Sequence, residues 1–369
     1  MREIIELTKE LNEASDKYYN GGTSPLTDAE FDAKLDQLKE LEETHNFRLV
    51  NSPTINVGAP VLDVLNKKSV GKRPMLSLDK CRIAEEIVKF AKGQSMVASV
   101  KADGLSVRLT YKNGKLISAV TRGNGYEGTD VTEHARQFLN IPSEIGTENL
   151  IIDGEAIIKA SDFAIINSDG RFKNPRNTAA GALNLLDMKE VKARRLSFVA
   201  WDVIEDEWAY YSDRRYQALQ LGFEWVPSTD TLDEEYDEIA VNNINEKILE
   251  WAEEYGIPCD GVVWKFNDLK YGESLGRTEK FFRNAIAYKP KDEEVESRLT
   301  GIEWTMGRSG ILTPVALFEP VVLNGNTISR ASLHNLDILK ETLGDKPYKG
   351  QLITVFLANC IIPQLKVGE

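Results

Sequence analysis

The chain has 369 residues, 42% of them hydrophobic, and its 45 lysines and arginines against 58 aspartates and glutamates give a net charge of -13. This length and apolar content suit two or three folded domains and exclude a disordered chain. No apolar run approaches the roughly 18 residues of a membrane span, and the charged beginning MREIIELTKEL is unlike a signal peptide. We therefore expect a soluble, cytoplasmic protein.

The cysteines give no metal or disulfide pattern. Cys81, Cys259 and Cys360 are widely separated, no Cys-x-x-Cys pair occurs, and the chain has three histidines. This arrangement excludes a zinc finger and makes a disulfide framework a poor interpretation. We expect no zinc site.

In chain order, the first 45 residues predict two helices, because apolar residues recur at helical spacing and Thr27-Asp28-Ala29-Glu30 is a capping box. From about residue 97 the pattern changes to short β-rich runs, at 97–101, 105–111, 116–122, 150–158, 196–204, 260–266 and 284–289. Their irregular alternation with helical segments predicts an α+β domain of largely antiparallel sheets. The Gly-punctuated, β-rich remainder predicts a small barrel. We expect domains at 1–63 (helical), 64–292 and 293–369.

Charge is segregated along the chain. The acidic stretch 230–254 predicts a solvated helix and its approach. In contrast, 171–195 and 265–291 are locally basic, which suits an anionic ligand or a nucleic-acid backbone.

A hairpin brings several charged residues together. Asn113-Gly114 predicts a two-residue turn that pairs Lys112 with Lys115. This register sets Leu105 opposite Arg122 and Gly104 opposite Gly123, so that Arg122 returns beside Lys101-Ala102-Asp103-Gly104. Taken alone, the cluster is better interpreted as a surface salt bridge at the base of a hairpin.

Other strands add groups of the same kind. Alternation places Asp153 and Glu155 on one face of their strand, Lys265 faces away from its apolar neighbours, and Lys289 closes another strand. Together with Lys101 and Arg122 these lysines indicate a phosphate site. A lysine amine can attack a phosphate when deprotonated, while cations stabilise the phosphoryl charge. Carboxylates such as Glu155 and Asp260 would hold Mg²⁺, usually through water. The set predicts nucleotidyl transfer.

Seven short sequence motifs, in their order along the chain, resemble those of the NAD⁺-dependent DNA ligases of bacteria, and the resemblance covers nearly the full chain. The similar strings are Pro74-Met75-Leu76-Ser77-Leu78, Lys101-Ala102-Asp103-Gly104, Thr121-Arg122-Gly123-Asn124-Gly125, Asp153-Gly154-Glu155, Phe172-Lys173-Asn174-Pro175-Arg176-Asn177-Thr178-Ala179-Ala180-Gly181, Asp260-Gly261-Val262-Val263-Trp264-Lys265 and Ala285-Ile286-Ala287-Tyr288-Lys289. The resemblance implies that Lys101 carries AMP through a phosphoramidate bond. It implies the catalytic set Lys101, Asp103, Arg122, Glu155, Asp260, Lys265 and Lys289.

The resemblance also implies how the ligands bind. The N-terminal helices would grip the nicotinamide mononucleotide half of NAD⁺ through Tyr18, Tyr19, Asp28, Phe31 and Asp32. The rest of the cofactor would contact Ser77, Leu78, Ser99, Lys101, Arg122, Glu155, Trp201, Lys265 and Lys289. Mg²⁺, or Mn²⁺ in its place, would bind at Glu155 and Asp260. The implied DNA contacts are Arg176, Arg277, Arg308 and Arg330.

Residues 293–369 resemble the OB-fold of this family, and five residues differ from its usual pattern. Ser99 replaces the usual glutamate and Asn124 replaces an aspartate. Phe31 and Trp201 each replace a tyrosine, and Asn184 replaces an arginine. Retention of the lysines favours an active enzyme that has diverged.

Typical members continue into a zinc finger, helix-hairpin-helix units and a BRCT domain, none of which follows Pro363. We therefore expect a short ligase, a fragment, or the N-terminal chain of a two-chain ligase of the kind some bacteriophages encode, acting in the host cytoplasm. A second chain would then supply the missing modules. The expected function is sealing of nicked duplex DNA in replication and repair. The alternatives are an ATP-dependent polynucleotide ligase or capping-type nucleotidyltransferase, and an inert nucleic-acid-binding subunit.

Overall fold

The computed structural model describes residues 1–19, 26, 28–56, 67–172, 174–204, 208–232, 236–289, 294–306, 312–323, 326–333, 335–358 and 362–367. The chain divides into two compact units: unit 1 comprises residues 1–163 and 174–289, and unit 2 comprises 164–173 and 290–369. None of the helices in these described ranges combines the length and apolar character needed to cross a membrane. The division into three domains stays a prediction.

Unit 1 begins with the two helices that the sequence predicts, α1 (Arg2–Tyr19) and α2 (Asp28–His45). Ile4, Leu7 and Leu11 of α1 pack with Leu38 of α2, and Phe31 lies partly buried against this cluster. The helical spacing of these apolar residues explains the pairing, since it gives each helix one stripe to bury. The expected Asn20-Gly21-Gly22 connection lies outside the described residues.

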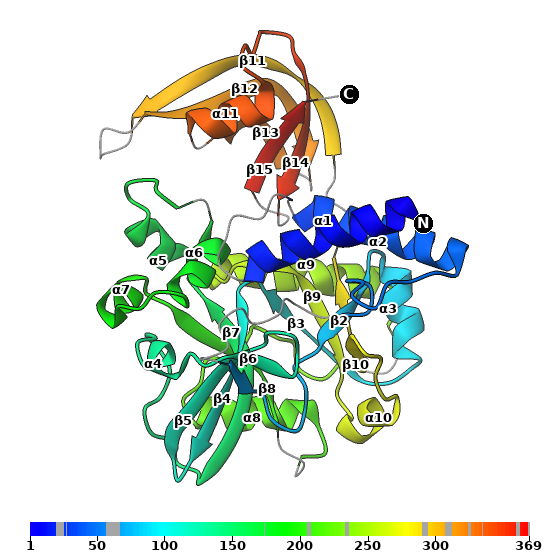
Figure 1. Cartoon of the computed structure of the whole chain (residues 1–369), viewed down its shortest axis with the longest axis vertical. Coiled ribbons are helices and arrows are strands. Elements are labelled where there is room, and N and C mark those ends of the chain that lie inside the picture. The colour runs from blue at the N-terminus through cyan, green and yellow to red at the C-terminus, as the bar shows by residue number, and fades with distance from the viewer. Residues whose placement is uncertain are drawn as a thin grey trace. The chain divides into compact units, whose positions relative to one another are not determined.

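The first sheet of unit 1 has the strand order β2-β10-β9-β3. Its strands are β2 (Ser77–Cys81), β3 (Met96–Ala102), β9 (Cys259–Phe266) and β10 (Phe281–Tyr288). Strand β9 is antiparallel to both neighbours, whereas β10 is parallel to β2. Helices α3 (Ala84–Ala91) and α9 (Glu238–Glu254) pack on one face (Figure 1). There, Trp264 donates a 2.8 Å hydrogen bond to Asn245 and Phe90 stacks on Phe266. The opposite face is left for the site.

The second sheet is fully antiparallel, with the order β5-β4-β7-β8. Its strands are β4 (Leu105–Lys112), β5 (Lys115–Thr121), β7 (Asn149–Ile157) and β8 (Ser197–Val203), and a small ribbon pairs β1 (Lys67–Ser69) with β6 (Glu127–Thr129). The remaining helices before residue 290 are α4 (Thr132–Ala135), α5 (Ala160–Ile166), α6 (Pro175–Ala182), α7 (Met188–Ala193), α8 (Tyr211–Gln220) and α10 (Leu269–Ser274). Each of the seven predicted β-runs forms a strand, which confirms the α+β class.

The register of the β4–β5 hairpin differs by one residue from the prediction. Lys112 does pair with Lys115 across Asn113-Gly114. An irregularity beyond Tyr111 then makes Thr110 the partner of Ser118, so one residue of β5 is left over. As a result, the N–H of Arg122 donates to the carbonyl of Ser106 at 3.0 Å. The prediction that Leu105 lies opposite Arg122, and Gly104 opposite Gly123, is therefore wrong. The turn sequence fixes the first pairs only, and the bulge changes the rest.

A buried ion pair ties β4 to β7. Arg108 and Asp153 lie directly opposite each other, with Nε–Oδ1 and Nη2–Oδ2 distances of 2.6 and 2.7 Å. Both side chains are less than 5% exposed. The same guanidinium donates to the carbonyls of Val70 and Arg73, so it also fixes the segment that enters β2.

Unit 2 contains a curled, antiparallel five-stranded sheet with the order β13-β12-β11-β14-β15. Its elements are β11 (Glu294–Met306), β12 (Leu312–Leu323), β13 (Asn326–Ser332), α11 (Leu336–Leu343), β14 (Leu352–Ala358) and β15 (Ile362–Val367). The edge strands β13 and β15 contact each other, which closes the curl around Leu299, Phe318 and Ile353. This architecture is consistent with the expected OB-fold barrel. Helix α11, capped by Asn335, is an element that the sequence did not predict.

Replacing Arg108 with methionine tests the buried pair. We expect Arg108→Met to lower the free energy of unfolding by about 3–5 kcal/mol, because it leaves the Asp153 carboxylate buried without its partner. Lys115→Met is the matched control on the same sheet, since Lys115 pairs with Glu144 at 3.6 Å and both side chains are about 70% exposed. This variant should lower the free energy of unfolding by less than about 1 kcal/mol. Urea unfolding measures both, and equal losses would contradict the assignment.

Candidate active site

A cavity of about 330 Å³ lies between the facing surfaces of the two sheets of unit 1. The first sheet contributes Val263 and Lys265 of β9 and the consecutive residues 99–102 of β3, which include Lys101. The second sheet contributes Asp153 and Glu155 of β7. Because side chains alternate along a strand, the β9 residues on the other face, Val262, Trp264 and Phe266, are buried in the apolar core behind the sheet.

Most residues expected at the site line this cavity. They are Phe31, Asp32, Ser77, Leu78, Ser99, Lys101, Arg122, Glu155, Arg176, Trp201, Asp260, Lys265 and Lys289. Asp103 lies just behind the lining and is 4% exposed. The side chains of Tyr18, Tyr19 and Asp28, and the whole of Arg308, lie outside the described residues.

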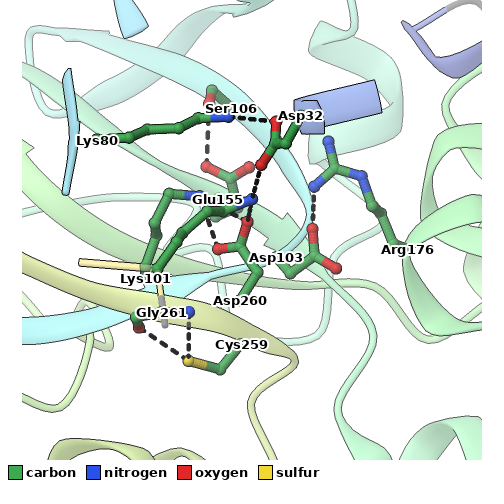
Figure 2. A network of polar contacts seen from close by, with 11 residues as sticks. Asp32, Lys80, Lys101, Asp103, Ser106, Glu155, Arg176, Cys259, Asp260 and Gly261 are labelled. Atoms are coloured by element: carbon green, nitrogen blue, oxygen red, sulfur yellow. Dashed lines mark hydrogen bonds and ion pairs between the residues drawn. The ribbon is translucent and has the colours of Figure 1, made fainter. Parts of the chain in front are cut away.

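Three lysines and two aspartates form a continuous series of contacts, which we call the lysine–aspartate chain: Lys101, Asp260, Lys289, Asp32 and Lys80. Figure 2 labels four of them: Lys101, Asp260, Asp32 and Lys80. The Nζ of Lys101 donates to both oxygens of Asp260, at 2.6 and 2.8 Å. Lys289 lies between the carboxylates, 2.9 Å from Asp260 and 3.5 Å from Asp32. Lys80 ends the chain 2.5 Å from Asp32.

The lysines keep both aspartates ionised. Burial alone would raise the pKa of Asp260, but the charges of Lys101 and Lys289 outweigh it and hold this pKa well below its usual range. The pKa of Asp32 is lowered in the same way, against burial, by Lys289 and Lys80. The chain therefore connects helix α2 with the strand that carries Lys101.

The backbone beside Asp260 is tightly packed. Gly261 has φ 153°, and a side-chain carbon added there would lie 2.2 Å from the carbonyl oxygen of Tyr288. The thiol of Cys259 donates to the Gly261 carbonyl at 3.0 Å (Figure 2). A glycine is thus required next to Asp260 for β9 to approach β10.

Arg176 reaches the lysine motif from helix α6. The helix begins at Pro175, after Asn174, whose side chain accepts from the N–H of Asn177 at 2.7 Å. This start directs Arg176 to the carboxylate of Asp103, with which it forms an ion pair (Figure 2). The pair positions Arg176 at the edge of the cavity.

Glu155 is a buried acid whose negative charge is only partly compensated by nearby cations. Its carboxylate accepts a 3.0 Å hydrogen bond from Ser106 and is 8% exposed as a residue. Burial raises the pKa of Glu155 to about 7, although the charges of Arg176 and Arg122 act in the opposite direction. A cation brought close to Glu155 would favour the ionised form of this carboxylate.

Lys265 is held by Asp202, which the sequence analysis did not single out. The Nζ–Oδ2 distance is 2.7 Å, and the ammonium lies 4.1 Å from the centre of the Tyr211 ring. Burial lowers the pKa of Lys265 to about 8, with Asp202 opposing it. Arg214 contacts the other oxygen of Asp202 at 3.0 Å, so this carboxylate bridges two buried cations.

The cavity is positive although the chain is acidic. Among the described residues that line it are seven cations and five acids, an excess of two positive charges before Glu155 is protonated: Arg73, Lys80, Lys101, Arg122, Arg176, Lys265 and Lys289 against Asp32, Asp153, Glu155, Asp202 and Asp260. This balance suits a ligand that carries phosphates.

A divalent cation fits this cavity if phosphate oxygens of a bound ligand supply part of its coordination. In the ranges that the structure describes, no three His, Cys, Asp or Glu side chains are grouped to hold a metal. Mg²⁺ commonly takes one or two carboxylates together with phosphate oxygens and water. Glu155 suits this role because its carboxylate is buried and incompletely compensated, whereas both oxygens of Asp260 already accept from lysines.

The remaining predicted DNA contacts lie away from the cavity. Arg277 is exposed and donates a 3.1 Å hydrogen bond to the hydroxyl of Tyr126, which is itself 48% exposed. In unit 2, Arg330 is exposed on β13 and pairs with Glu303 at 3.0 Å.

Sequence reasoning missed Lys80, Arg108 and Asp202. Lys80 follows the string that ends at Leu78, and alternation along β2 would have placed both on one face. Arg108 and Asp202 required the pairing of β4, β7 and β8, which no turn in the sequence fixes.

Comparison with protein families gives three matches that together cover almost the whole chain. Residues 1–58 match the DNA ligase-like, N-terminal NAD⁺-binding domain, residues 66–293 the NAD-dependent DNA ligase adenylation domain, and residues 296–367 the NAD-dependent DNA ligase OB-fold domain.

Similar full-length proteins carry the name DNA ligase. The one from Lachnoclostridium phytofermentans is 41% identical over 98% of this chain and 56% of its own length. Those from Ruminiclostridium cellulolyticum and Mycoplasmopsis agalactiae are 39% and 35% identical over 99% and 92% of this chain, and 55% and 54% of their own lengths. The chain thus spans about half the length of the curated relatives it matches.

The raised pKa of Glu155 predicts a pH-dependent stability. An acid with a folded pKa of about 7 and an ordinary value of 4.5 favours the folded state at low pH, and this contribution is lost as the pH rises from 4.5 through 7. We expect the unfolding free energy of Glu155→Gln to rise relative to wild type by about 2–3 kcal/mol between pH 5 and pH 8. Urea titrations across this range measure it. Parallel curves for the two proteins would contradict the assignment.

Proposed function

The chain belongs to the family of NAD-dependent DNA ligases, and from this membership we propose that it forms a lysyl-AMP at Lys101 from NAD⁺ and uses the AMP to seal nicks in duplex DNA. The observation that carries the proposal is the environment of Lys101, whose Nζ is held by Asp260 within a cavity that has an excess of positive charge.

In the first step, Lys101 attacks the adenylyl phosphorus of NAD⁺. The nitrogen–phosphorus bond forms, the bond from phosphorus to the bridging oxygen breaks, and nicotinamide mononucleotide leaves with the electron pair. The ammonium must first lose a proton. That proton passes to water, because the neighbouring lysines hold the pKa of Asp260 too low for its carboxylate to keep it. Asp260 instead directs the nitrogen toward the cavity, since both of its oxygens lie within 2.8 Å of Nζ.

The other cations stabilise the charge that develops on the phosphoryl oxygens. Lys289 and Lys265 extend from neighbouring strands of the first sheet, and Arg122 follows β5 of the second. Arg176 with Asp103 holds the edge of the cavity nearest α6. Bound Mg²⁺, or Mn²⁺ in its place, would be held by Glu155 and would add positive charge at the phosphates.

The two halves of NAD⁺ would bind on opposite parts of the cavity. Ser77, Leu78, Ser99 and Trp201 form the apolar and stacking surface for adenine, in which Ser99 supplies a hydroxyl in place of a carboxylate. Phe31 and Asp32 of α2 receive the nicotinamide mononucleotide half. Contacts from Tyr18, Tyr19 and Asp28 remain predictions.

In the later steps, a 5′-phosphate oxygen at the nick attacks the adenylyl phosphorus and Lys101 leaves with a proton. The 3′-hydroxyl then attacks the 5′-phosphorus and displaces AMP. Arg176, Arg277, Arg308 and Arg330 are our candidates for the DNA backbone, together with the barrel of unit 2. A second chain that adds further DNA-binding modules remains a prediction.

The rival functions lose support for specific reasons. An ATP-dependent ligase or capping-type enzyme does not account for the N-terminal helices, which match an NAD⁺-binding domain. An inert nucleic-acid-binding subunit does not account for the retained contacts of Lys101 with Asp260 and of Lys265 with Asp202.

AMP transfer to Lys101 is directly testable by intact-mass spectrometry of the AMP-stripped protein after incubation with Mg²⁺ and NAD⁺ or ATP. We expect the mass of one AMP to be added from NAD⁺ and not from ATP. Lys101→Ala should abolish the adduct, because the nucleophile is gone. Lys115→Ala, a solvated lysine of β5, is the matched control and should form the adduct normally. An adduct from ATP alone, or none from either nucleotide, would contradict the proposal.

The role of Arg277 in DNA binding is tested by its salt dependence. We expect Arg277→Gln to weaken binding to nicked duplex DNA about equally for different sequences and to reduce the slope of log K against log salt by about 1, as loss of one phosphate contact requires. Fluorescence anisotropy between 50 and 200 mM salt, roughly the range in which such slopes are resolved, provides the measurement. Lys89→Gln, on the exposed side of α3, is the control. An unchanged slope for Arg277→Gln would exclude the contact.

A further inference from the structure

Lys80 is placed at the site by the parallel pairing of β2 with β10. In this register Lys80 lies beside Ala287, and the N–H of Lys289 donates to the carbonyl of Cys81 at 2.9 Å. Lys80, Ala287 and Lys289 all line the cavity. Two ammonium groups therefore emerge from the same end of neighbouring strands, on the same face of the sheet.

The two ammonium groups share one carboxylate. Lys80 contacts Oδ1 of Asp32 at 2.5 Å (Figure 2). Lys289 approaches Oδ2 of the same carboxylate at 3.5 Å. Along the lysine–aspartate chain, Lys289 is next to the Asp260 that holds Lys101, whereas Lys80 is one carboxylate farther from the nucleophile. The cations thus form a row that begins at the attacking nitrogen and ends at helix α2.

An anion in addition to Asp32 would reduce the repulsion between the ammonium groups of Lys80 and Lys289. Lys80 is 38% exposed as a side chain, so a ligand in the cavity can reach it. Burial and the neighbouring charge of Lys289 lower the pKa of Lys80, and Asp32 only partly offsets them. A dianionic pyrophosphate matches a row of this kind, since each phosphate can face its own lysine.

We propose that Lys80 binds the phosphate of the nicotinamide mononucleotide half of NAD⁺, the group that departs when Lys101 is adenylylated; the assignment rests on the proposed function. The adenylyl phosphate then faces Lys101 and Lys289, and the departing phosphate faces Lys80. When the bond from the adenylyl phosphorus to the bridging oxygen breaks, that oxygen keeps the electron pair and Lys80 neutralises the added charge. The departing phosphate replaces Asp32 as the partner of Lys80, which leaves the carboxylate for the ribose hydroxyls or the nicotinamide cation.

The simpler role for Lys80 is structural: its ion pair with Asp32 would hold α2 against β2. Loss of such an ion pair would move Asp32 and weaken binding of the whole nicotinamide mononucleotide half. Loss of a phosphate contact would weaken binding only of ligands that carry the phosphate. Comparing nicotinamide mononucleotide with nicotinamide riboside separates the two roles, because these ligands differ in that phosphate alone.

The first experiment is calorimetric binding of both ligands to the AMP-stripped full chain. We expect Lys80→Met to weaken binding of nicotinamide mononucleotide about 10- to 100-fold, as expected for loss of a hydrogen bond between charged groups, and to leave nicotinamide riboside within about twofold. Lys80→Arg should recover most of the loss, and Lys89→Met, on the exposed side of α3, is the matched control. Equal weakening of the two ligands, no weakening of either, or no binding of nicotinamide mononucleotide to the wild type would overturn the assignment.

The second experiment follows the reaction. Lys80→Met should slow AMP-adduct formation at saturating NAD⁺ by about 10- to 100-fold, since the contact strengthens as the leaving group gains charge. Once adenylylated, the same variant should be slowed much less in passing AMP to nicked DNA than in forming the adduct, because the mononucleotide is absent from that step. A wild-type rate of adduct formation in Lys80→Met would refute the role of Lys80 while leaving the proposed function intact. Failure of the wild type itself to form an adduct would refute the proposed function instead, and the binding comparison would still decide the assignment of Lys80.

Discussion

The contact between Lys101 and Asp260 is the constraint on which the rest of the site depends. A lysine in a partly enclosed cavity is stable when a carboxylate compensates its charge, and Asp260 supplies both oxygens. That carboxylate is buried in turn, so it needs a second cation, which is Lys289. The requirement continues through Asp32 to Lys80. Each buried charge makes its neighbour necessary, and the series ends where the cavity is open enough for water to solvate Lys80.

The two sheets make this series possible by keeping polar and apolar residues apart. Along β9, Val262, Trp264 and Phe266 are buried, whereas Val263 and Lys265 face the cavity. Gly261 lets β9 approach the end of β10, which brings the strand end of Lys289 close to Asp260. Strand alternation supplies the direction of each side chain, and the close approach of the backbones supplies the short distances.

The sequence predicted the parts of the fold that local patterns encode. Helical spacing located α1 and α2, and β-rich runs located seven strands. Thirteen predicted site residues line one cavity. Most of them lie on or next to strands that meet there, whereas Phe31 and Asp32 lie on α2 and Arg176 lies on α6. The bulge in the β4–β5 hairpin was not predictable, since Asn113-Gly114 fixes only the pairs next to the turn. Arg108 opposite Asp153 and Lys80 beside Ala287 depend on registers between distant strands. Those registers are set by tertiary packing.

The charges also explain how a phosphate cavity can persist in an acidic chain before its ligand arrives. The net charge of -13 says little about the cavity, whose described lining carries an excess of cations. Without phosphates, Lys80, Lys101 and Lys289 would repel one another across a site that water screens poorly. Asp32 and Asp260 act as internal anions that hold the three ammonium groups in a row. If NAD⁺ binds as we propose, its pyrophosphate would exchange with carboxylates already in place, so the lysines would need little rearrangement. The free energy of breaking those ion pairs would be subtracted from that of binding, which would favour release of the mononucleotide once its bond to the adenylyl phosphorus is broken.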